Sequence, residues 1–456
     1  MFSKLLIANR GEIALRVARA CRELGIAVVA VHSTADRDSP VVRMADQAVH
    51  IGPPQPSASY LNIANIIEAA RTTGADAIHP GYGFLSEDPD FAEICAQEDL
   101  VFVGPRPEVM QQLGNKATAR ALMAEAGLPM LPGTIEPVRS VKEGEAIAAE
   151  IGYPVIIKAA AGGGGRGMTV VHDPREFAEA FTTTQATAHA VFRDPTVYVE
   201  RYLTGARHVE VQIMCDLDGE GVHLGERDCS IQRRHQKLIE EAPCTRLDAR
   251  GRAEIGELAL RGALSVGYSG AGTMEFLLDD QGRFYFMEMN TRIQVEHPVT
   301  EMVTGVDLIK EQIRVAAGLP LSVKQEDVVL HGAAIECRVN AEDPRRGFAP
   351  APGLLEVFEP PAGPWTRVDS GYTAGMQVSP YYDSMLAKLV VWAPTRDEAL
   401  DRMDRALGEF RIEGRGVSTT LGFHRAVIGH PMFRAGTHDL KFLEQFNAEN
   451  GEFDGL

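Results

Sequence analysis

The sequence has few cysteines and no long apolar run, and these two features exclude several classes of protein. No two cysteines form a Cys-x-x-Cys pair, and their spacing matches no zinc or disulfide framework. We therefore expect reduced thiols in a cytoplasmic protein. No apolar stretch approaches the ~18 residues that a membrane-spanning helix needs. The apolar N-terminal stretch meets Asn9 and Arg10 too early for a signal peptide, so we expect no membrane partner.

Basic residues are in the minority. The chain has 45 Lys and Arg against 63 Asp and Glu, which gives a formal net charge of −18. This balance argues against a nucleic-acid partner or an anionic membrane surface. It does not exclude phosphate ligands, because these need only a local cluster of cations. At 456 residues the chain is long enough for two or three domains with cores of their own.

The N-terminal region lacks a dinucleotide-binding fingerprint, although strand and helix patterns alternate in it. Apolar strands are predicted at 5–8, 26–31, 75–78 and 101–104, with an amphipathic helix between the first two. This alternation is typical of a Rossmann-like parallel sheet with crossover helices. The first turn reads Asn9-Arg10-Gly11-Glu12 rather than G-x-G-x-x-G. We therefore predict an α/β unit that does not bind NAD.

The Walker pattern is also absent, and the most glycine-rich segment has a different setting. Residues 162–167 read Gly-Gly-Gly-Gly-Arg-Gly and lie between two apolar strand patterns. This arrangement predicts the tip of a hairpin rather than the start of a phosphate-binding helix. Taken alone, the loop fits a flexible surface loop almost as well as a phosphate site. Lys158 beside it, and Lys116 at a predicted helix start, favour phosphate.

Residues 272–290 predict a hairpin with two opposed carboxylates. If Gln281 and Gly282 form its loop, Glu275 lies opposite Glu288. Directly opposed side chains are about 5 Å apart at Cβ, so these two charges repel unless a cation lies between them. With Asn290 they form an oxygen-rich set that suits Mg²⁺ or Mn²⁺.

A polar row continues from this hairpin over residues 288–296. A solvated edge face is the alternative interpretation, but such a row beside opposed carboxylates suits a metal ion, phosphates and a small anion. In an extended strand, one face would carry Glu288, Asn290, Arg292, Gln294 and Glu296.

Further donors and acceptors lie between the glycine loop and the hairpin. Residues 200–203 end a predicted strand, where an adenine could meet backbone groups. His208 and Glu210 share one face of the next strand. The segment 232–237 is a dense run of donors in an otherwise acidic chain. We expect its inward-facing members to be Gln232, His235 and Lys237.

In this order, the segments resemble the biotin carboxylase family of the ATP-grasp superfamily. The resemblance covers roughly residues 2–446. The motifs that carry it are Ile-Ala-Asn-Arg-Gly-Glu-Ile-Ala at 7–14, His-Pro-Gly-Tyr-Gly-Phe-Leu-Ser-Glu at 79–87, the glycine loop, Glu-Arg-Asp-Cys-Ser-Ile-Gln-Arg-Arg-His-Gln-Lys at 226–237 and Glu-Met-Asn-Thr-Arg-Ile-Gln-Val-Glu-His-Pro-Val-Thr-Glu at 288–301. The expected fold is multidomain, α/β and α+β. Its parts are a Rossmann-like pre-ATP-grasp domain at 1–113, an ATP-grasp domain at 114–330 with a mobile lid at 131–203, a C-terminal biotin carboxylase domain at 331–446 and a tail at 447–456.

The resemblance implies ATP-dependent carboxylation of biotin by bicarbonate through carboxyphosphate. It implies ATP contacts from Lys116, Lys158, Gly163, Gly164, Gly165, Gly167, Glu200, Leu203, His208, Gln232, His235, Glu275 and Glu288. Two Mg²⁺ or Mn²⁺ ions are expected on Glu275, Glu288 and Asn290. The resemblance places bicarbonate against Lys237, Arg292, Gln294 and the backbone of Val295. Glu296 would be the general base, Arg338 would stabilise the biotin enolate, and Tyr82 would lie near the biotin pocket.

The resemblance also implies partners. The sequence has no Met-Lys-Met biotinylation segment, so we expect biotin on a separate carrier protein or domain. We also expect a homodimer, together with one or more carboxyltransferase subunits. The expected role is the first half-reaction of an acyl-CoA carboxylase, such as acetyl-CoA carboxylase in fatty acid biosynthesis.

Two alternatives remain at this point. Another ATP-grasp ligase, with a different acceptor, would share the nucleotide residues but not residues 292–296 and Arg338. A non-catalytic regulatory protein would have lost Glu296, Lys237 or a metal carboxylate, all of which are present.

Overall fold

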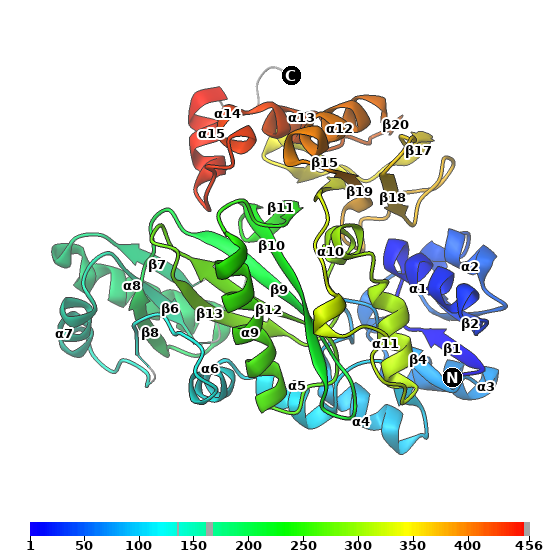
Figure 1. Cartoon of the computed structure of the whole chain (residues 1–456), viewed down its shortest axis with the longest axis horizontal. Helices are drawn as coiled ribbons and strands as arrows, with labels where there is room; N and C mark the ends of the chain where they lie inside the picture. The colour runs from blue at the N-terminus through cyan, green and yellow to red at the C-terminus, as the bar shows by residue number, and fades with distance from the viewer. Residues whose placement is uncertain (135, 161–166, 451–456) are drawn as a thin grey trace.

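The computed structural model describes residues 1–134, 136–160 and 167–450. Within them the chain forms three parts (Figure 1): an N-terminal unit, a central sheet with a small side unit, and a C-terminal helical layer. This architecture confirms the expected mixture of α/β and α+β domains.

The N-terminal unit is a parallel sheet in the order β3-β2-β1-β4-β5. β3 was not predicted, because this edge strand buries only Ile51 and so lacks an apolar pattern. The strands are β1 Lys4–Ile7, β2 Ala27–Ser33, β3 Gln47–Gly52, β4 Ala77–His79 and β5 Val101–Phe102. The helices are α1 Gly11–Glu23, α2 Pro40–Met44, α3 Ile63–Thr73, α4 Pro89–Gln97 and α5 Pro107–Gly114.

The segment after β5 forms two helices, α5 and α6 (Lys116–Glu125). Asn115 separates them because its side chain accepts a hydrogen bond from the backbone N–H of Thr118 and so caps α6. This cap places Lys116 at the first residue of α6, as predicted.

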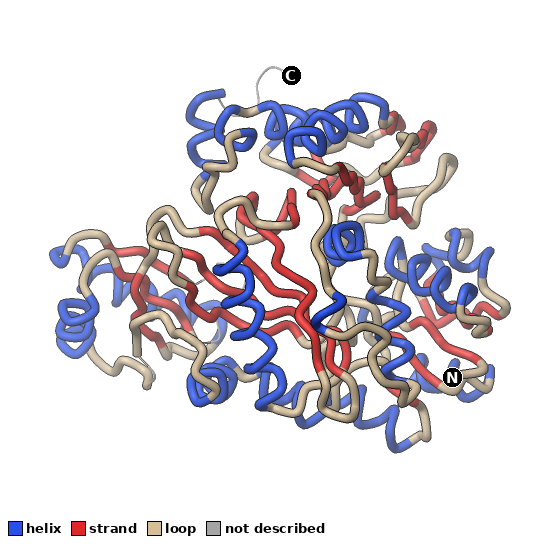
Figure 2. Tube along the Cα trace, in the orientation of Figure 1, coloured by secondary structure: helices blue, strands red, loops and turns tan. Residues whose placement is uncertain are grey.

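Eight antiparallel strands form the central sheet, in the order β13-β12-β9-β10-β11-β14-β19-β18. Its strands run through the middle of the molecule (Figure 2). Because β11 pairs with β14, the sheet runs without a break past residue 330, where a domain boundary was expected. The strands are β9 Arg207–Cys215, β10 Gly221–Arg233, β11 Gln236–Ala242, β12 Gly270–Leu278, β13 Phe284–Asn290, β14 Ala333–Asn340, β18 Thr366–Ser370 and β19 Met385–Ala393. The helices of this region are α9 Ala249–Ser265, α10 His297–Thr304 and α11 Leu308–Ala316.

β12 and β13 form the predicted hairpin, with Glu275 opposite Glu288. The predicted two-residue loop is wrong, since residues 279–283 separate the strands. Asp279 stabilises this longer turn by accepting hydrogen bonds from the backbone N–H groups of Gln281 and Arg283, each at 2.9 Å. A register shift after Glu275 restores the pairing of the two carboxylates.

The polar row at 288–296 is not one strand. β13 ends at Asn290 and α10 begins at His297. The backbone N–H of Thr291 leaves the sheet because it donates to the carboxylate of Glu87 in the N-terminal unit, at 3.0 Å. Residues 291–296 therefore form a connection that turns into the cavity.

The side unit contains the predicted glycine hairpin. Its antiparallel sheet has the order β7-β6-β8, and α7 and α8 pack against it. The elements are α7 Val141–Ile151, β6 Val155–Ala159, β7 Met168–Val171, α8 Phe177–Phe192 and β8 Val197–Arg201. A separate apolar cluster, including Ile157, Phe177 and Val199, forms its core. Gly163, Gly164 and Gly165 lie outside the described residues.

The C-terminal layer covers the far end of the central sheet (Figure 1). Its elements are β15 Glu342–Asp343, β16 Ala349–Pro350, β17 Leu354–Glu359, β20 Arg411–Arg415, α12 Arg396–Glu409, α13 Leu421–Gly429, α14 Pro431–Arg434 and α15 Phe442–Asn450. The tail expected from Asn447 begins inside a helix, because α15 extends to Asn450.

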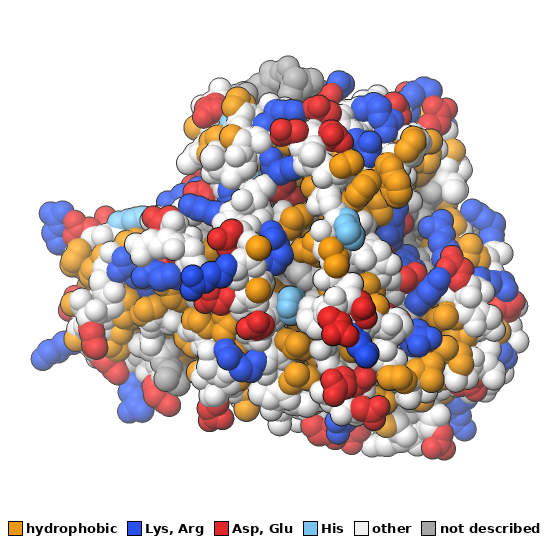
Figure 3. Space-filling model, viewed as in Figure 1, with side chains coloured by type: hydrophobic (Ala, Val, Ile, Leu, Met, Phe, Trp, Pro, Cys, Tyr) orange, Lys and Arg blue, Asp and Glu red, His pale blue; other side chains and the backbone are white. Residues whose placement is uncertain are grey.

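The state of the cysteines and the mixture of charges on the surface are those expected from the composition. All six cysteines are free and buried. On the face shown in Figure 3, acidic and basic side chains are interspersed. None of the helices described is both long and apolar enough to cross a membrane.

Candidate active site

A cavity of ≈ 1570 Å³ lies where the N-terminal unit, the side unit and the central sheet meet. Most of the predicted site residues line it: Tyr82, Lys116, Lys158, Glu200, His208, Gln232, His235, Lys237, Glu275, Glu288, Asn290, Arg292, Gln294, Val295, Glu296 and Arg338. Two predicted residues that the structure describes do not line it. A side chain at Gly167 would meet Ala159 and Phe192, and Leu203 lies just beyond β8.

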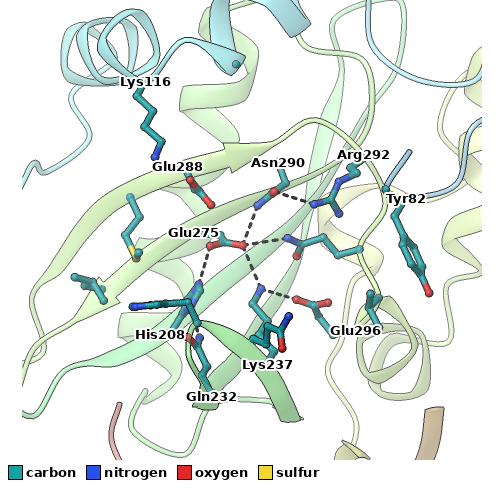
Figure 4. A pocket seen from close by; sticks show the side chains of 18 of the residues that line it. Tyr82, Lys116, His208, Gln232, Lys237, Glu275, Glu288, Asn290, Arg292 and Glu296 are labelled. Carbon is teal, nitrogen blue, oxygen red and sulfur yellow. Dashed lines mark hydrogen bonds and ion pairs between the residues drawn. The ribbon is translucent and has the colours of Figure 1, made fainter. Parts of the chain in front are cut away.

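Glu275 is the centre of the polar network (Figure 4). Its Oε1 accepts hydrogen bonds from Asn290 at 2.8 Å, Gln294 at 3.0 Å and Lys237 at 3.1 Å. Its Oε2 lies 2.9 Å from Nε2 of His208. Burial alone would raise the pKa of Glu275, but the charges of Lys237 and His208 outweigh burial and hold it well below the usual range. Glu275 is therefore an anion at neutral pH.

Lys237 joins three carboxylates at the base of the cavity. Its Nζ lies 2.5 Å from Glu210, 2.5 Å from Glu296 and 3.1 Å from Glu275. Burial opposes its protonation, yet the three carboxylates raise the pKa of Lys237 well above its ordinary value. The charge of Lys237 is fixed, and its position is set from three directions.

Glu296 lies between two cations. Its Oε1 meets Lys237, and its Oε2 accepts a hydrogen bond from Nη2 of Arg338 at 2.9 Å. Burial would raise the pKa of Glu296, but Lys237 and Arg338 hold it well below the usual range. Glu296 is therefore ionised and able to accept a proton from a ligand in the cavity.

Arg292 crosses from the central sheet toward the N-terminal unit. Its Nε donates to Glu87 at 2.9 Å, and its Nη2 donates to Asn290 at 3.2 Å. On the same side, the hydroxyl of Tyr82 donates to Glu12, whose Oε1 lies 3.0 Å from Nζ of Lys388. In Figure 4, Tyr82 lies across the cavity from Lys116 and Glu288.

The other end of the cavity is apolar with a charged edge. Lys158 and Arg120 bind the carboxylate of Glu200 at 2.5 Å and 3.1 Å. The apolar lining there comes from Met130, Leu131, Met168, Leu277, Phe286 and Met287. A flat apolar ligand with polar edges fits this end.

His235 enters the cavity through the turn between β10 and β11. Arg234 and His235 have φ angles of 50° and 64°, which form a two-residue hairpin turn. Gln232 and Lys237, on either side of the turn, are paired in the register and both line the cavity.

The opposed carboxylates Glu275 and Glu288 fit a divalent cation. Burial raises the pKa of Glu288, and the neighbouring charge of Glu275 raises it further. A cation between the two would remove this repulsion. Asn290 offers its amide oxygen next to them, although this oxygen accepts from Arg292 here. The oxygen-only set suits Mg²⁺.

Some residues of this network were not predicted. Arg227 is fully buried and fixes two site neighbours, donating to Glu210 at 2.6 Å and to Gln294 at 3.2 Å. Glu87, which binds Arg292, ends the motif at 79–87, and that position was the available signal. Glu12 and Lys388 are far apart in sequence, so no spacing pattern connects them.

The comparisons with known proteins agree across the chain. Residues 1–110 match the family model of the biotin carboxylase N-terminal domain, and residues 336–445 match that of the biotin carboxylase C-terminal domain. Residues 115–324 match the ATP-binding domain of the carbamoyl-phosphate synthase L chain. A biotin carboxylase of Nostoc sp. is 55% identical over 98% of this chain and 99% of its own. The chain belongs to the biotin carboxylase family. It is a ligase that carboxylates biotin with ATP and bicarbonate.

The names of other relatives of this biotin carboxylase point to different carboxylases. Biotin carboxylase 1 of Bacillus subtilis is 54% identical over 98% of this chain and 99% of its own. A pyruvate carboxylase subunit of Methanothermobacter thermautotrophicus is 52% identical over 98% of this chain and 90% of its own. The biotin carboxylase domain dimer of Hydrogenobacter thermophilus 2-oxoglutarate carboxylase, crystallised with MgADP, ADP and bicarbonate, is 45% identical. The two structures superpose with a TM-score of 0.92, and the alignment covers 100% of this chain and 99% of the Hydrogenobacter chain.

Proposed function

We propose that this ligase carries out the first half-reaction of a biotin-dependent acyl-CoA carboxylase, on biotin borne by a separate carrier. The observation that supports the reaction best is Glu296 between Lys237 and Arg338, because it places a base and two cations at one point. Relatives named biotin carboxylase are 54% and 55% identical, and a pyruvate carboxylase subunit is 52% identical, so the acyl-CoA acceptor is the part of the proposal that the acceptor assay below tests.

ATP occupies the end of the cavity near the side unit in this proposal. The adenine lies among the apolar lining residues, with Glu200 at its edge. Lys116 and Lys158 neutralise phosphate oxygens and His235 donates a hydrogen bond to them, because all three line the cavity. Glu275, Glu288 and Asn290 would hold Mg²⁺, which neutralises charge on the phosphates when bound.

Bicarbonate lies between Arg292 and Lys237, next to Gln294 and the backbone of Val295. When bicarbonate accepts hydrogen bonds from Lys237, this lysine stabilises Glu296 less. The pKa of Glu296 then rises from its depressed value, which makes it a better base for the bicarbonate proton. The side unit closes over the cavity as a lid and keeps water from carboxyphosphate.

Arg338 stabilises the enolate oxygen of biotin in this proposal. Arg338→Gln should lower biotin carboxylation by about 10²–10³-fold, the usual loss when one oxyanion donor is removed. Bicarbonate-dependent ATP hydrolysis without biotin should fall much less. Parallel assays of ADP release and carboxybiotin formation measure both quantities. Equal losses in the two assays would remove Arg338 from the biotin step.

Lys158 contacts the phosphate end of ATP in this proposal. Lys158→Gln should raise the KM for ATP by about tenfold, since a charge-assisted bond contributes about 1.5–3 kcal/mol. The KM for biotin should stay within about twofold. Lys142→Gln is a matched control, because this exposed lysine on α7 belongs to the same unit and does not line the cavity. An unchanged KM for ATP in the Lys158 variant would contradict the assignment.

The carrier and the acceptor have a direct test. The tagged chain, isolated from its own cells, should retain a biotinylated protein that streptavidin detects. With that complex, labelled bicarbonate should be fixed when acetyl-CoA or propionyl-CoA is added. Fixation with pyruvate or 2-oxoglutarate alone would overturn the proposed acceptor. We also propose a homodimer, as in the Hydrogenobacter domain dimer, with light scattering as its test.

A further inference from the structure

Two buried glutamates lie directly behind Arg338. Glu240 on β11 stands opposite Glu336 on β14 in the antiparallel register, and both are 0% exposed. Directly opposed side chains are about 5 Å apart at Cβ, so the two carboxyl groups face each other on one side of the sheet. Neither residue lines the cavity itself.

The two carboxyl groups have few partners. Oε1 of Glu240 accepts from Nε of Arg338 at 2.6 Å. Oε2 of Glu240 and both oxygens of Glu336 are buried without a hydrogen-bond partner in the described residues. A buried carboxylate needs hydrogen bonds or a paired cation to be stable. Glu336 has neither in the described part of the chain, so it cannot be a stable anion as placed.

The charged groups packed around the pair already bind other partners. Lys388 on β19 forms an ion pair with Glu12 and donates a hydrogen bond to the carbonyl of Val295. Lys237 on β11 forms ion pairs with Glu210, Glu275 and Glu296. On the connection into α10, Glu296 binds Arg338, and the imidazole of His297, which begins that helix, is fully buried. Arg338 is therefore the one cation, among the described residues, within ion-pair distance of Glu240.

The protonation equilibria agree with this geometry. Burial raises the pKa of Glu336 well above the usual range; the charge of Lys388 opposes this rise and that of Glu240 adds to it. Burial also raises the pKa of Glu240, to about 7, against the opposing charge of Arg338. Burial alone would lower the pKa of Arg338, but the charges of Glu240 and Glu296 raise it above its ordinary value, so Arg338 stays charged. The pair favours a bound proton, and the arginine keeps its charge.

We infer that Glu240 and Glu336 share one proton and act together as a positioning pair for Arg338. Protonated Glu336 donates to Oε2 of Glu240, and Oε1 of Glu240 accepts from Arg338. The pair then carries a single negative charge, and every oxygen of Glu240 is satisfied. This inference rests on the proposed role of Arg338 in the biotin step, since neither glutamate touches a substrate.

The single charge matters for the biotin step. If both carboxyls were ionised, two negative charges behind Arg338 would cancel its field at the enolate oxygen. If both were neutral, Arg338 would keep a hydrogen bond to Glu240 but would form an ion pair only with Glu296, the proposed base. With one shared proton, Arg338 stays anchored from behind and still presents positive charge to the cavity.

Infrared spectroscopy tests the shared proton without any assay of activity. The whole protein at neutral pH should show the C=O band of a protonated carboxylic acid, and this band should shift in D₂O. Glu336→Gln should remove it. Glu336→Leu, which needs no hydrogen bond, is the second variant in case the first does not fold. A band of unchanged intensity in a folded Glu336 variant would overturn the shared proton.

Kinetics test the positioning role. Glu240→Leu removes the anchor of Arg338 and should raise the KM for biotin, or lower carboxylation, by about 10–100-fold, because small misplacements at a reacting centre have effects of this size. Bicarbonate-dependent ATP hydrolysis without biotin should stay within about threefold. An unchanged biotin step in Glu240→Leu would overturn positioning. Normal carboxylation in Arg338→Gln would instead refute the proposed role of Arg338.

Discussion

Replacing Glu296 by Gln should lower biotin carboxylation by about 10²–10⁴-fold, the usual contribution of a general base. Gln keeps the shape of the side chain and an oxygen for Lys237, but it cannot take the proton of bicarbonate. ATP should still bind, because the side chain lies beyond the phosphate-binding lysines. Carboxybiotin formation and the dissociation constant of ATP are the two measurements.

A matched control for this variant is Glu226→Gln. Glu226 is a buried carboxylate of β10 that pairs with Arg252 and does not line the cavity. Its loss should lower the melting temperature and leave the rate per folded molecule within about threefold, as for a structural ion pair. Full activity of the Glu296 variant, or equal losses in both variants, would show that Glu296 is not the base.

The second large effect is expected at the metal site. Glu288→Gln removes one of the two opposed carboxylates and should raise the Mg²⁺ concentration for half-maximal activity by on the order of 10–100-fold. Even residues that only support a metal ligand cause changes of that size. The variant should fold at least as stably as the parent without metal, because it removes the repulsion from Glu275 that raises the pKa of Glu288. A magnesium titration of ATP hydrolysis measures the effect.

Asp280→Asn is the control for the metal-site variant. Asp280 is an exposed acid in the turn of the same hairpin, and it does not line the cavity. Its magnesium titration should match that of the parent. If the Glu288 variant also matched the parent, the metal would have to lie elsewhere.

Local patterns predicted those parts of the fold in which short-range chemistry decides the structure. The apolar period of α1, the glycine hairpin of β6 and β7, and the pairing of Glu275 with Glu288 all follow from neighbouring residues. A tight turn between two strands brings three predicted residues into the cavity lining: Gln232, His235 and Lys237. In each case the deciding contacts lie within about 20 residues along the chain.

The parts that were missed depend on contacts between distant segments. The row at 288–296 leaves the sheet after Asn290 because Glu87, in the N-terminal unit, takes the next backbone N–H group. The pairing of β11 with β14, which lie on either side of residue 330, is a contact of the same kind. The environments of Arg338 and Glu296 likewise combine β11, β14 and the connection before α10. No pattern within a short window contains these contacts.

ADP release by the purified chain with Mg²⁺, ATP and bicarbonate, with and without biotin, tests most directly whether this chain is a biotin carboxylase. We expect turnover that depends on bicarbonate and rises when biotin is added, and that rises further with the natural biotinylated carrier. Hydrolysis that is indifferent to both free biotin and the carrier would refute biotin carboxylation as its reaction.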